Sequence, residues 1–397
     1  MNFRQPLSIA ALLACSACGR DAQRAPAVAL TELMAGGDLR GFERADEPRA
    51  FAFPEDHGAH RAFLTEWWYV TGNLESEAGE PFGFHLTIFR RGLPRGERAT
   101  SSLAADELYL AHFAIADGRT GTMHAHERTA RGAGGLAGAT LEHDGFRVWL
   151  EDWEMRSIPT PTFDLGPIHE GEPLGLRLVA GEGDDALELD LTSVKPAVLQ
   201  GDAGLSVKGD GEGQASYYYA HTRLEALGQV TVDGERTAVV GQAWLDREWS
   251  TSALGEGQVG WDWFALQLDD GSDLMLYQMR LADGGVDATS HGSWTELDGT
   301  HRKLERGAYA IEVVDRWRSE RSGAEYPSGW RVRVPEEQLE LEVAPLFADQ
   351  ELPFAIVYWE GAVRFTGTRA GAPVSGVGFV EMTGYADQAA DERAARR

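Results

Sequence analysis

Short runs in which apolar and polar residues alternate make up most of the chain, and turn residues separate them. Residues 66–90 and residues 261–280 share one pattern: an aromatic-headed strand, a polar turn, and a return strand that ends in arginine. In the second of them, Asp270-Gly271 supplies the residues with positive φ that a tight turn between antiparallel strands requires. The pattern predicts a β-hairpin that occurs once in each half of the chain.

The segment that closes each half also repeats. Residues 217–246 pass from a tyrosine cluster through a short strand and a turn to Gly-Gln-Ala-Trp-Leu-Asp. Residues 358–381 pass from Tyr-Trp through a short strand to Gly-Val-Gly-Phe-Val-Glu. The shared order predicts two related β-domains with a boundary near residues 250–257.

Further strand-like runs, separated by glycine turns, fill the rest of both halves. They lie at 108–116, 146–153, 174–179, 186–191, 217–224, 293–297, 308–317, 329–334, 339–343 and 354–365. Short strands at this spacing form antiparallel sandwiches or barrels. We therefore predict an all-β fold of two consecutive antiparallel β-barrels packed against each other. The expected first barrel spans 51–252, the second spans 253–386, and a polar tail follows at 387–397.

The first eighteen residues have the pattern of a lipoprotein signal peptide. An apolar stretch at 6–14 is too short to span a bilayer as a mature helix. It runs into Leu-Leu-Ala-Cys15, which resembles the lipobox, where cysteine becomes the lipidated first residue. Cys18 is the second candidate, and an ordinary secretory signal is the alternative. Residues 19–50, rich in alanine, glycine and charge, are expected to form a flexible tether.

Lipidation at Cys15 predicts a protein of the cell envelope that faces the periplasm. Neither Cys15 nor Cys18 is followed by aspartate, which favours the outer membrane over the inner one. The net charge of -27 argues against binding to nucleic acid or to anionic lipid by charge. A lipid anchor is therefore the expected route to the membrane.

Common catalytic motifs are absent from the sequence. It holds no dinucleotide-binding glycine motif, no P-loop and no serine-hydrolase elbow, and His124-Ala125-His126-Glu127 lacks the second histidine that a zinc protease motif needs. Both cysteines lie near the N-terminus, so the rest of the chain offers no thiolate nucleophile. We expect no cofactor and no metal, including at His57, His60 and His85.

Aromatic rings and polar groups share one face of the first hairpin. Trp67, Tyr69 and Thr71 lie on one side of the outgoing strand, and His85 and Phe89 lie on the mixed side of the returning strand. This mixture suits a barrel lumen that holds a large apolar ligand with a few polar contacts. Trp67, Tyr69 and His85 are therefore candidate ligand-binding residues. The alternative is that the 12 tryptophans fill the two barrels and their interface.

Carboxylates also lie beside indoles where the two domains are predicted to meet. A carboxyl near apolar rings has a raised pKa and can donate a proton, and aromatic faces stabilise a developing carbocation. Asp246 and Asp262 are the candidate catalytic acids. The candidate rings around them are Trp249, Trp261 and Tyr277. The alternative is a surface ion pair of Arg247 with a neighbouring acid.

Five segments together resemble one known family. They are Thr65–Gly72, Phe84–Arg90, Gly241–Trp249, Gly260–Gly271 and Tyr358–Gly361 with Phe379–Tyr385. The chain is similar, from about residue 54 to 385, to the AttH/carotenoid 1,2-hydratase (hydroxyneurosporene synthase) family. The resemblance implies two lipocalin-like β-barrels. It also implies either hydration of acyclic carotenoids, a pericyclisation, or the role of a secreted lipoprotein similar to an accessory component of an ABC-type export system.

Arg247 departs from the Asp-His-Glu-Trp pattern usual in that family. Arginine does not shuttle a proton near neutral pH, which argues against hydratase activity. The favoured hypothesis is a cell-envelope, lipocalin-like lipoprotein that binds a lipid or isoprenoid, with an ABC-type export complex as a candidate partner. The alternatives are a carotenoid 1,2-hydratase-like enzyme and a non-catalytic structural envelope protein.

Overall fold

The fold is taken from a computed structural model. It describes residues 39–93, 105–142, 145–160, 173–251 and 254–395. The expected signal peptide with Cys15 and Cys18, and the first part of the expected tether, lie outside the described residues. No helix among those described is long and apolar enough to cross a membrane.

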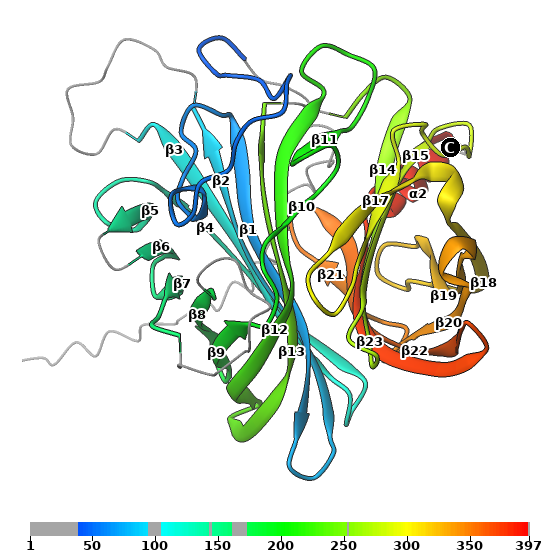
Figure 1. The fold of residues 1–397 in the computed structure, drawn as a ribbon. Coiled ribbons are helices and arrows are strands. Elements are labelled where there is room, and N and C mark those ends of the chain that lie inside the picture. The colour runs from blue at the N-terminus through cyan, green and yellow to red at the C-terminus, as the bar shows by residue number, and fades with distance from the viewer. Residues whose placement is uncertain (1–38, 94–104, 143–144, 161–172, 252–253, 396–397) are drawn as a thin grey trace, which may run out of the picture.

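The first half of the chain forms one antiparallel sheet that curls into a nearly closed barrel (Figure 1). Its strands follow the order β4-β3-β2-β1-β13-β12-β9-β8-β7-β6-β5, and two short strands, β10 and β11, also pair with β12. The strands are β1 (Thr65–Ser76), β2 (Pro81–Gly92), β3 (Glu107–Asp117), β4 (Thr122–Arg131), β5 (Ala137–Glu142), β6 (Gly145–Leu150), β7 (Trp153–Ser157), β8 (Gly175–Glu182), β9 (Asp185–Ser193), β10 (Val198–Leu199), β11 (Leu205–Val207), β12 (Ala215–Val232) and β13 (Glu235–Ser250).

The second half forms a smaller antiparallel sheet, curved into a half-barrel beside the first. Its order is β17-β16-β15-β14-β23-β22-β20-β19-β18, and β21 also pairs with β22. The strands are β14 (Gln258–Leu268), β15 (Asp273–Leu281), β16 (His291–Thr295), β17 (His301–Glu305), β18 (Ala310–Arg318), β19 (Glu325–Val334), β20 (Leu339–Pro345), β21 (Glu351–Pro353), β22 (Val357–Arg369) and β23 (Ala372–Met382). The prediction of two consecutive antiparallel barrels is confirmed.

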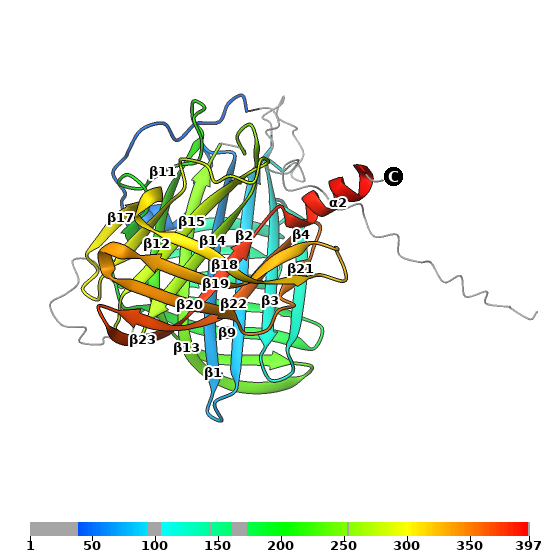
Figure 2. The same cartoon turned by 90° about the vertical axis from the view of Figure 1, so that its right-hand side faces the viewer.

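Helices play a small part in the described fold. Three are single 3-10 turns: η1 (Glu55–His57), η2 (Arg306–Ala308) and η3 (Pro335–Glu337). The α-helix α2 (Tyr385–Ala395) covers most of the segment expected to be a polar tail and packs against β19 and β22. Figure 2 shows this helix at the side of the second sheet, which lies in front of the first in that view.

Both hairpins expected from the repeat are present. In the first, Trp67 pairs with Phe89 across β1 and β2, and in the second, Trp263 pairs with Tyr277 across β14 and β15. Each hairpin joins the last strand of its own half, because β1 pairs with β13 and β14 pairs with β23. The closing segments therefore lie beside the hairpins in space.

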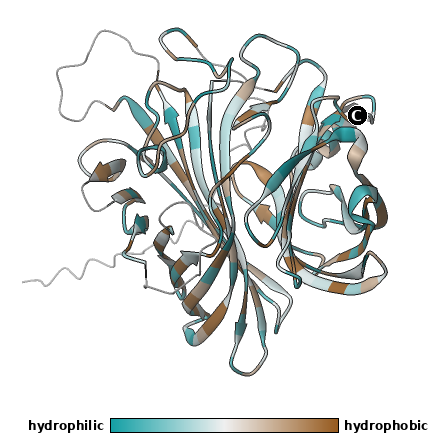
Figure 3. Ribbon diagram, viewed as in Figure 1, coloured by the Kyte–Doolittle hydropathy of each residue, from teal (hydrophilic) through white to brown (hydrophobic). Residues whose placement is uncertain are grey.

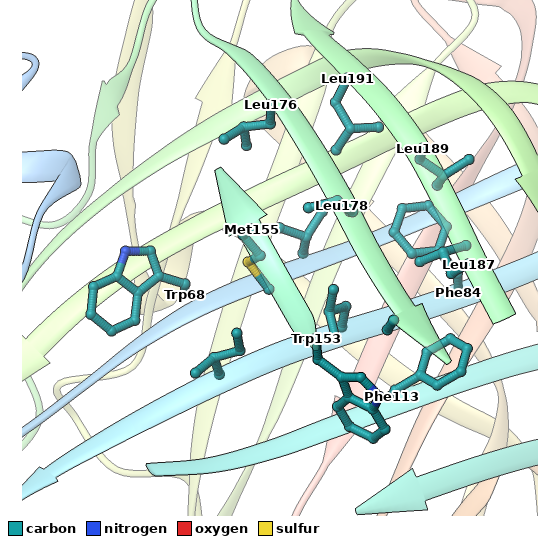
Figure 4. Close-up of a cluster of buried hydrophobic side chains, with 14 of the residues drawn as sticks. Trp68, Phe84, Phe113, Trp153, Met155, Leu176, Leu178, Leu187, Leu189 and Leu191 are labelled. Atoms are coloured by element: carbon teal, nitrogen blue, oxygen red, sulfur yellow. The ribbon is translucent and has the colours of Figure 1, made fainter. Parts of the chain in front are cut away.

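Apolar side chains pack the interior of the first barrel. Hydrophobic and hydrophilic residues alternate along the strands (Figure 3), and the inward set includes Trp68, Phe84, Phe113 and Trp153, which meet leucines of β8 and β9 (Figure 4). The mixed face of the first hairpin points the other way. Tyr69 packs with Trp263 of the second sheet. The expectation that this face lines a barrel lumen is wrong, because the fully apolar face occupies the lumen.

Candidate functional site

A cavity of about 340 Å³ lies between the two barrels. Strands β1, β2, β3, β4, β12 and β13 of the first sheet line it, together with β14, β15, β22 and β23 of the second. Its lining combines aromatic rings and carboxyl groups. The main members are Trp67, Tyr69, Phe89, His112, Tyr218, Asp246, Glu248, Trp261, Trp263, Tyr277, Tyr358, Glu360 and Glu381.

The register of the first sheet brings its part of the lining together. Tyr69 of β1 pairs with Asp246 of β13, and Trp67 pairs with Glu248, two residues further along β13. Tyr218 of β12 pairs with Glu248 on the other side. Because side chains on one strand face recur every second residue, these five residues project from the same face of the sheet.

The second sheet contributes a single row of four side chains across four strands. Tyr277 of β15 pairs with Trp263 of β14, Trp263 pairs with Glu381 of β23, and Glu381 pairs with Glu360 of β22. Two carboxyl groups are therefore direct neighbours on adjacent strands. This row faces the aromatic and acidic face of the first barrel across the cavity.

Asp246 is buried and held by two donors. Tyr218 Oη donates to Asp246 Oδ2 at 2.7 Å, and Trp244 Nε1 donates to Asp246 Oδ1 at 2.7 Å. Trp263 Nε1 in turn donates to Tyr218 Oη at 3.3 Å, which links the carboxyl to the second barrel. Burial raises the pKa of Asp246 to about 7, against the lowering by these two hydrogen bonds. The group can therefore hold or release a proton near neutral pH.

Burial also raises the pKa of Glu381 and of Glu360. Burial raises the pKa of Glu381 to about 8, and Trp261 Nε1 donates to its Oε1 at 3.2 Å. Burial, with the charge of Glu381, raises the pKa of Glu360 well above its ordinary value. Tyr69 Oη donates to Glu360 Oε1, while Glu360 Oε2 has no hydrogen-bond partner. Three buried carboxyl groups with raised pKa values thus face one aromatic cavity.

A fourth carboxylate is paired with a lysine. Lys208 Nζ lies 3.1 Å from Glu248 Oε1 and 4.3 Å from the centre of the Tyr277 ring. Ser216 donates to the same oxygen of Glu248. Glu248 is therefore paired with a lysine inside the cavity.

His112 is the cavity's histidine. Its Nδ1 lies 2.7 Å from Tyr358 Oη, and its Nε2 lies 3.3 Å from Glu127 Oε2. Burial lowers the pKa of His112, so the imidazole is neutral at pH 7. The candidate His85 lies behind this wall instead, buried between Tyr69 and His112 and bonded to Thr87.

The cavity brings together five of the eight residues expected to act in catalysis or binding. Trp67, Tyr69, Asp246, Trp261 and Tyr277 line it. The other three, His85, Trp249 and Asp262, do not.

Trp249 and Asp262 point away from the cavity for a simple reason of strand register. Trp249 packs beneath His60, with the ring centres 3.6 Å apart. Asp262 Oδ1 accepts a hydrogen bond from Arg280 Nε at 3.1 Å, and Tyr385 of α2 contacts the other oxygen. Each lies an odd number of residues from a cavity residue on its strand, so its side chain leaves the opposite face.

Arg247 belongs to a buried ion cluster and not to the cavity. Its Nη2 lies 3.2 Å from Glu66 Oε2, and its guanidinium stacks 4.0 Å from the ring of Trp68. Arg90 binds the other oxygen of Glu66. The surface ion pair considered for Arg247 is therefore not formed. Because Arg247 lies outside the cavity, it no longer argues against proton transfer there.

Sequence reasoning missed Glu381, Glu360 and Tyr218. A signal for Glu381 was available, because it is the acid that ends the second closing segment, as Asp246 ends the first. Both acids line the cavity from the last strand of their sheet. Glu360 follows the aromatic pair Tyr-Trp, and its position opposite Glu381 depends on the β22–β23 register.

The cavity does not contain a set of metal ligands among the described residues. The group of metal-type ligands that the described residues do form is His124, Asp185 and Asp233, at the edge of the first barrel.

Comparison with known proteins decides the family. The AttH-like family matches residues 44–385. The chain belongs to the AttH-like family. No curated protein matches the sequence.

Solved structures share the two-barrel fold. A crystal structure from Nitrosomonas europaea, provisionally described as AttH, is 36% identical, with a TM-score of 0.73, and the match covers 87% of this chain and all of that one. Kievitone hydratase from Nectria haematococca is 15% identical, with a TM-score of 0.59 and coverage of 86% and 98%. CghA, solved with Sch210972, is 14% identical, with a TM-score of 0.52 and coverage of 88% and 97%. At these lower identities the likeness concerns the fold alone.

Proposed function

We propose that this protein binds an apolar, alkene-bearing molecule of isoprenoid type in the inter-barrel cavity and adds water to it by general-acid catalysis. One observation carries the proposal: Asp246, Glu360 and Glu381 are buried carboxyl groups whose pKa values are raised by burial, and all three face one aromatic enclosure. Apolar lining recognises the carbon skeleton, and the acids supply the proton that an isolated alkene needs.

The chemistry balances with residues of the cavity. A carboxyl group gives its proton to one alkene carbon, which leaves a carbocation on the other. Aromatic faces such as Trp67 and Trp263 stabilise that charge. Water then adds to the cation, and its surplus proton returns to the carboxylate. Asp246 is the first choice of donor, because its pKa of about 7 allows both steps at neutral pH.

Kievitone hydratase supports hydration as a chemistry compatible with this fold, since it shares the two-barrel architecture. The low identity transfers no substrate. The proposal therefore rests on the acids of the cavity and leaves the identity of the alkene to experiment.

The test is incorporation of labelled oxygen. Purified protein is incubated with acyclic isoprenoids in H₂¹⁸O, and the alcohol product is measured by mass spectrometry. We expect Asp246→Asn to lower kcat about 100-fold or more while KM changes little, because the lost group acts in the proton-transfer step. Asp262→Asn is the comparison, since this buried carboxyl lies outside the cavity. Equal loss in both variants, or loss in Asp262→Asn alone, contradicts the assignment.

A second candidate function is binding without turnover. The apolar residues of the lining, including Leu108, Leu110, Ile356 and Met279, favour retention of a lipid or isoprenoid. Native mass spectrometry of the purified protein tests this function. A co-purifying apolar molecule that gains no ¹⁸O supports a carrier and removes the hydratase.

We also propose that the protein works in the cell envelope, anchored through Cys15 or Cys18, with an ABC-type export complex as a candidate partner. The lipobox-like sequence supports this location. Metabolic labelling with palmitate tests it. The label should disappear in Cys15→Ser or in Cys18→Ser, and a wild-type protein without label contradicts the anchor.

A further inference from the structure

Strand β4 carries a second cluster of chemically active side chains, on the face turned away from the cavity. His124 and His126 are two residues apart and therefore share one face of the strand. Glu127, the next residue, lies on the opposite face and lines the cavity. The partners of the two histidines come from two hairpin turns. Asp185 begins β9, and Asp233 lies at the turn between β12 and β13.

One carboxylate oxygen lies between the two imidazoles. Asp185 Oδ2 is 3.2 Å from His124 Nδ1 and 2.9 Å from His126 Nε2. The ligand-type atoms of His124, Asp185 and Asp233 all lie within 4.8 Å of one another. Three segments distant in sequence thus bring one imidazole and two carboxylates together, and His126 reaches the central carboxylate from the same strand face.

We propose that His124, Asp185 and Asp233 bind a divalent transition-metal ion, with Zn²⁺ as the best fit and with His126, which contacts Asp185, as a further ligand brought in by rotation of its side chain. In a tetrahedral zinc site with bonds of about 2.0–2.1 Å, neighbouring ligand atoms lie about 3.3 Å apart, close to the two histidine–aspartate distances. Neutral imidazole and carboxylate are ligands that zinc accepts together. Small rotations of the side chains would admit the ion.

The orientation of the central ligand is already fixed. The backbone N–H of Asp233 donates to Asp185 Oδ1 at 3.1 Å, which leaves Oδ2 directed at the two histidines. Hydrogen bonds that orient a metal ligand in this way raise the affinity of a site. The same contact holds the turn that carries Asp233 next to the site.

The position of the site indicates what the ion does. Strand β4 is one end of the first sheet, and β9 lies far from it in the sheet order. An ion held by β4, β9 and the β12–β13 turn ties that end strand to the rest of the barrel. Arg128, on the same face of β4, adds an ion pair to Glu182 at 2.7 Å. The opposite face of β4 carries Glu127 into the cavity, so the ion would also fix one wall of the cavity.

Zinc binding to the full-length protein tests the site. The protein carries Cys15→Ser and Cys18→Ser, so that no thiol competes, and is freed of metal by a chelator. ZnCl₂ is then titrated by calorimetry, and Co²⁺ absorption is recorded for the tetrahedral signature. We expect one Zn²⁺ to bind and to raise Tm. Replacing His124 and His126 together with alanine should abolish binding, whereas His301→Ala, an exposed histidine of β17, should leave it unchanged.

Asp185→Asn decides the outcome if the double histidine variant does not fold. Asparagine keeps the shape and one acceptor oxygen, which can face the imidazoles in place of the hydrogen bond from the Asp233 backbone N–H, so a purely structural cluster should lose only part of its hydrogen bonds. A metal site should lose affinity at least about tenfold, because a charged ligand is gone. Zinc affinity unchanged in Asp185→Asn, or no saturable binding to the starting protein, overturns the proposal.

Discussion

Replacing Asp246 with asparagine should make the protein more stable at alkaline pH than the unchanged chain. Asp246 is buried, and its pKa is raised from 3.8 to about 7. The native protein therefore holds this proton more tightly than the unfolded chain does. The stability that the proton contributes is fully present below about pH 3.8 and is lost as the pH rises through about 7.

The size of the effect follows from the two pKa values. A rise from 3.8 to about 7 corresponds to a total of about 4 kcal/mol, at about 1.4 kcal/mol for each tenfold change in proton affinity. Roughly 2.7 kcal/mol of this total falls between pH 5 and pH 9, where unfolding can be measured easily. Asparagine resembles the neutral acid and can still accept the hydrogen bond from Trp244 Nε1. The variant should therefore not lose this stability as the pH rises.

Urea unfolding at pH 5 and pH 9 measures the effect. The free energy of unfolding of Asp246→Asn minus that of the unchanged protein should rise by about 2.7 kcal/mol between the two conditions. Glu256→Gln, a change at an exposed acid before β14, is the control and should show the same difference at both values. The difference in free energy of unfolding between Asp246→Asn and the unchanged protein could instead be the same at pH 5 and pH 9. In that case the carboxyl group of Asp246 titrates as an ordinary surface acid, and the assignment of Asp246 as proton donor fails.

Two further substitutions separate the cavity from its surroundings. Trp67→Ala should weaken retention of an acyclic isoprenoid by about 2 kcal/mol or more, measured by fluorescence titration, because a ring of the cavity wall is lost. Trp249→Ala removes an equal ring outside the cavity. It should destabilise the fold by about 3–5 kcal/mol and leave affinity unchanged, so equal affinity losses would contradict the placement. Arg247→Met should cost about 3 kcal/mol or more in urea unfolding, because Glu66 stays buried with one cation fewer, and an unchanged midpoint would contradict that ion cluster.

The two-barrel fold was predictable because its signal is local. The alternation in residues 66–90 and the Asp270-Gly271 turn define hairpins without knowledge of the rest of the chain. Helix α2 was less distinct, since its residues show little amphipathic character and its packing depends on Tyr385 meeting the second sheet.

The site was predictable only in part. The face from which each side chain projects determines whether it lines the cavity, and the sequence did not show which face lines the barrel lumen. Alternation correctly separated the mixed face of Trp67 and Tyr69 from the apolar face of Trp68. The alternation does not say which face becomes the inside of a barrel. The apolar face fills the lumen because burying it there removes the most hydrocarbon from water. The adjacent residues Asp246 and Arg247 lie on opposite faces of β13. The side chain of Asp246 therefore lines the cavity, and that of Arg247 belongs to the ion cluster with Glu66.

The arrangement also explains why one cavity needs both halves of the chain. Each closing segment ends in an acid, and Asp246 and Glu381 meet only when the two sheets face each other. Their surroundings are unequal: Asp246 accepts from both Tyr218 and Trp244, whereas Glu381 accepts from Trp261. Burial raises the pKa of both acids, to about 7 for Asp246 and to about 8 for Glu381, so both lie near neutral pH. Two related positions thus hold acids with different hydrogen-bond donors, and such a pair can divide the donation of a proton and the handling of water between them.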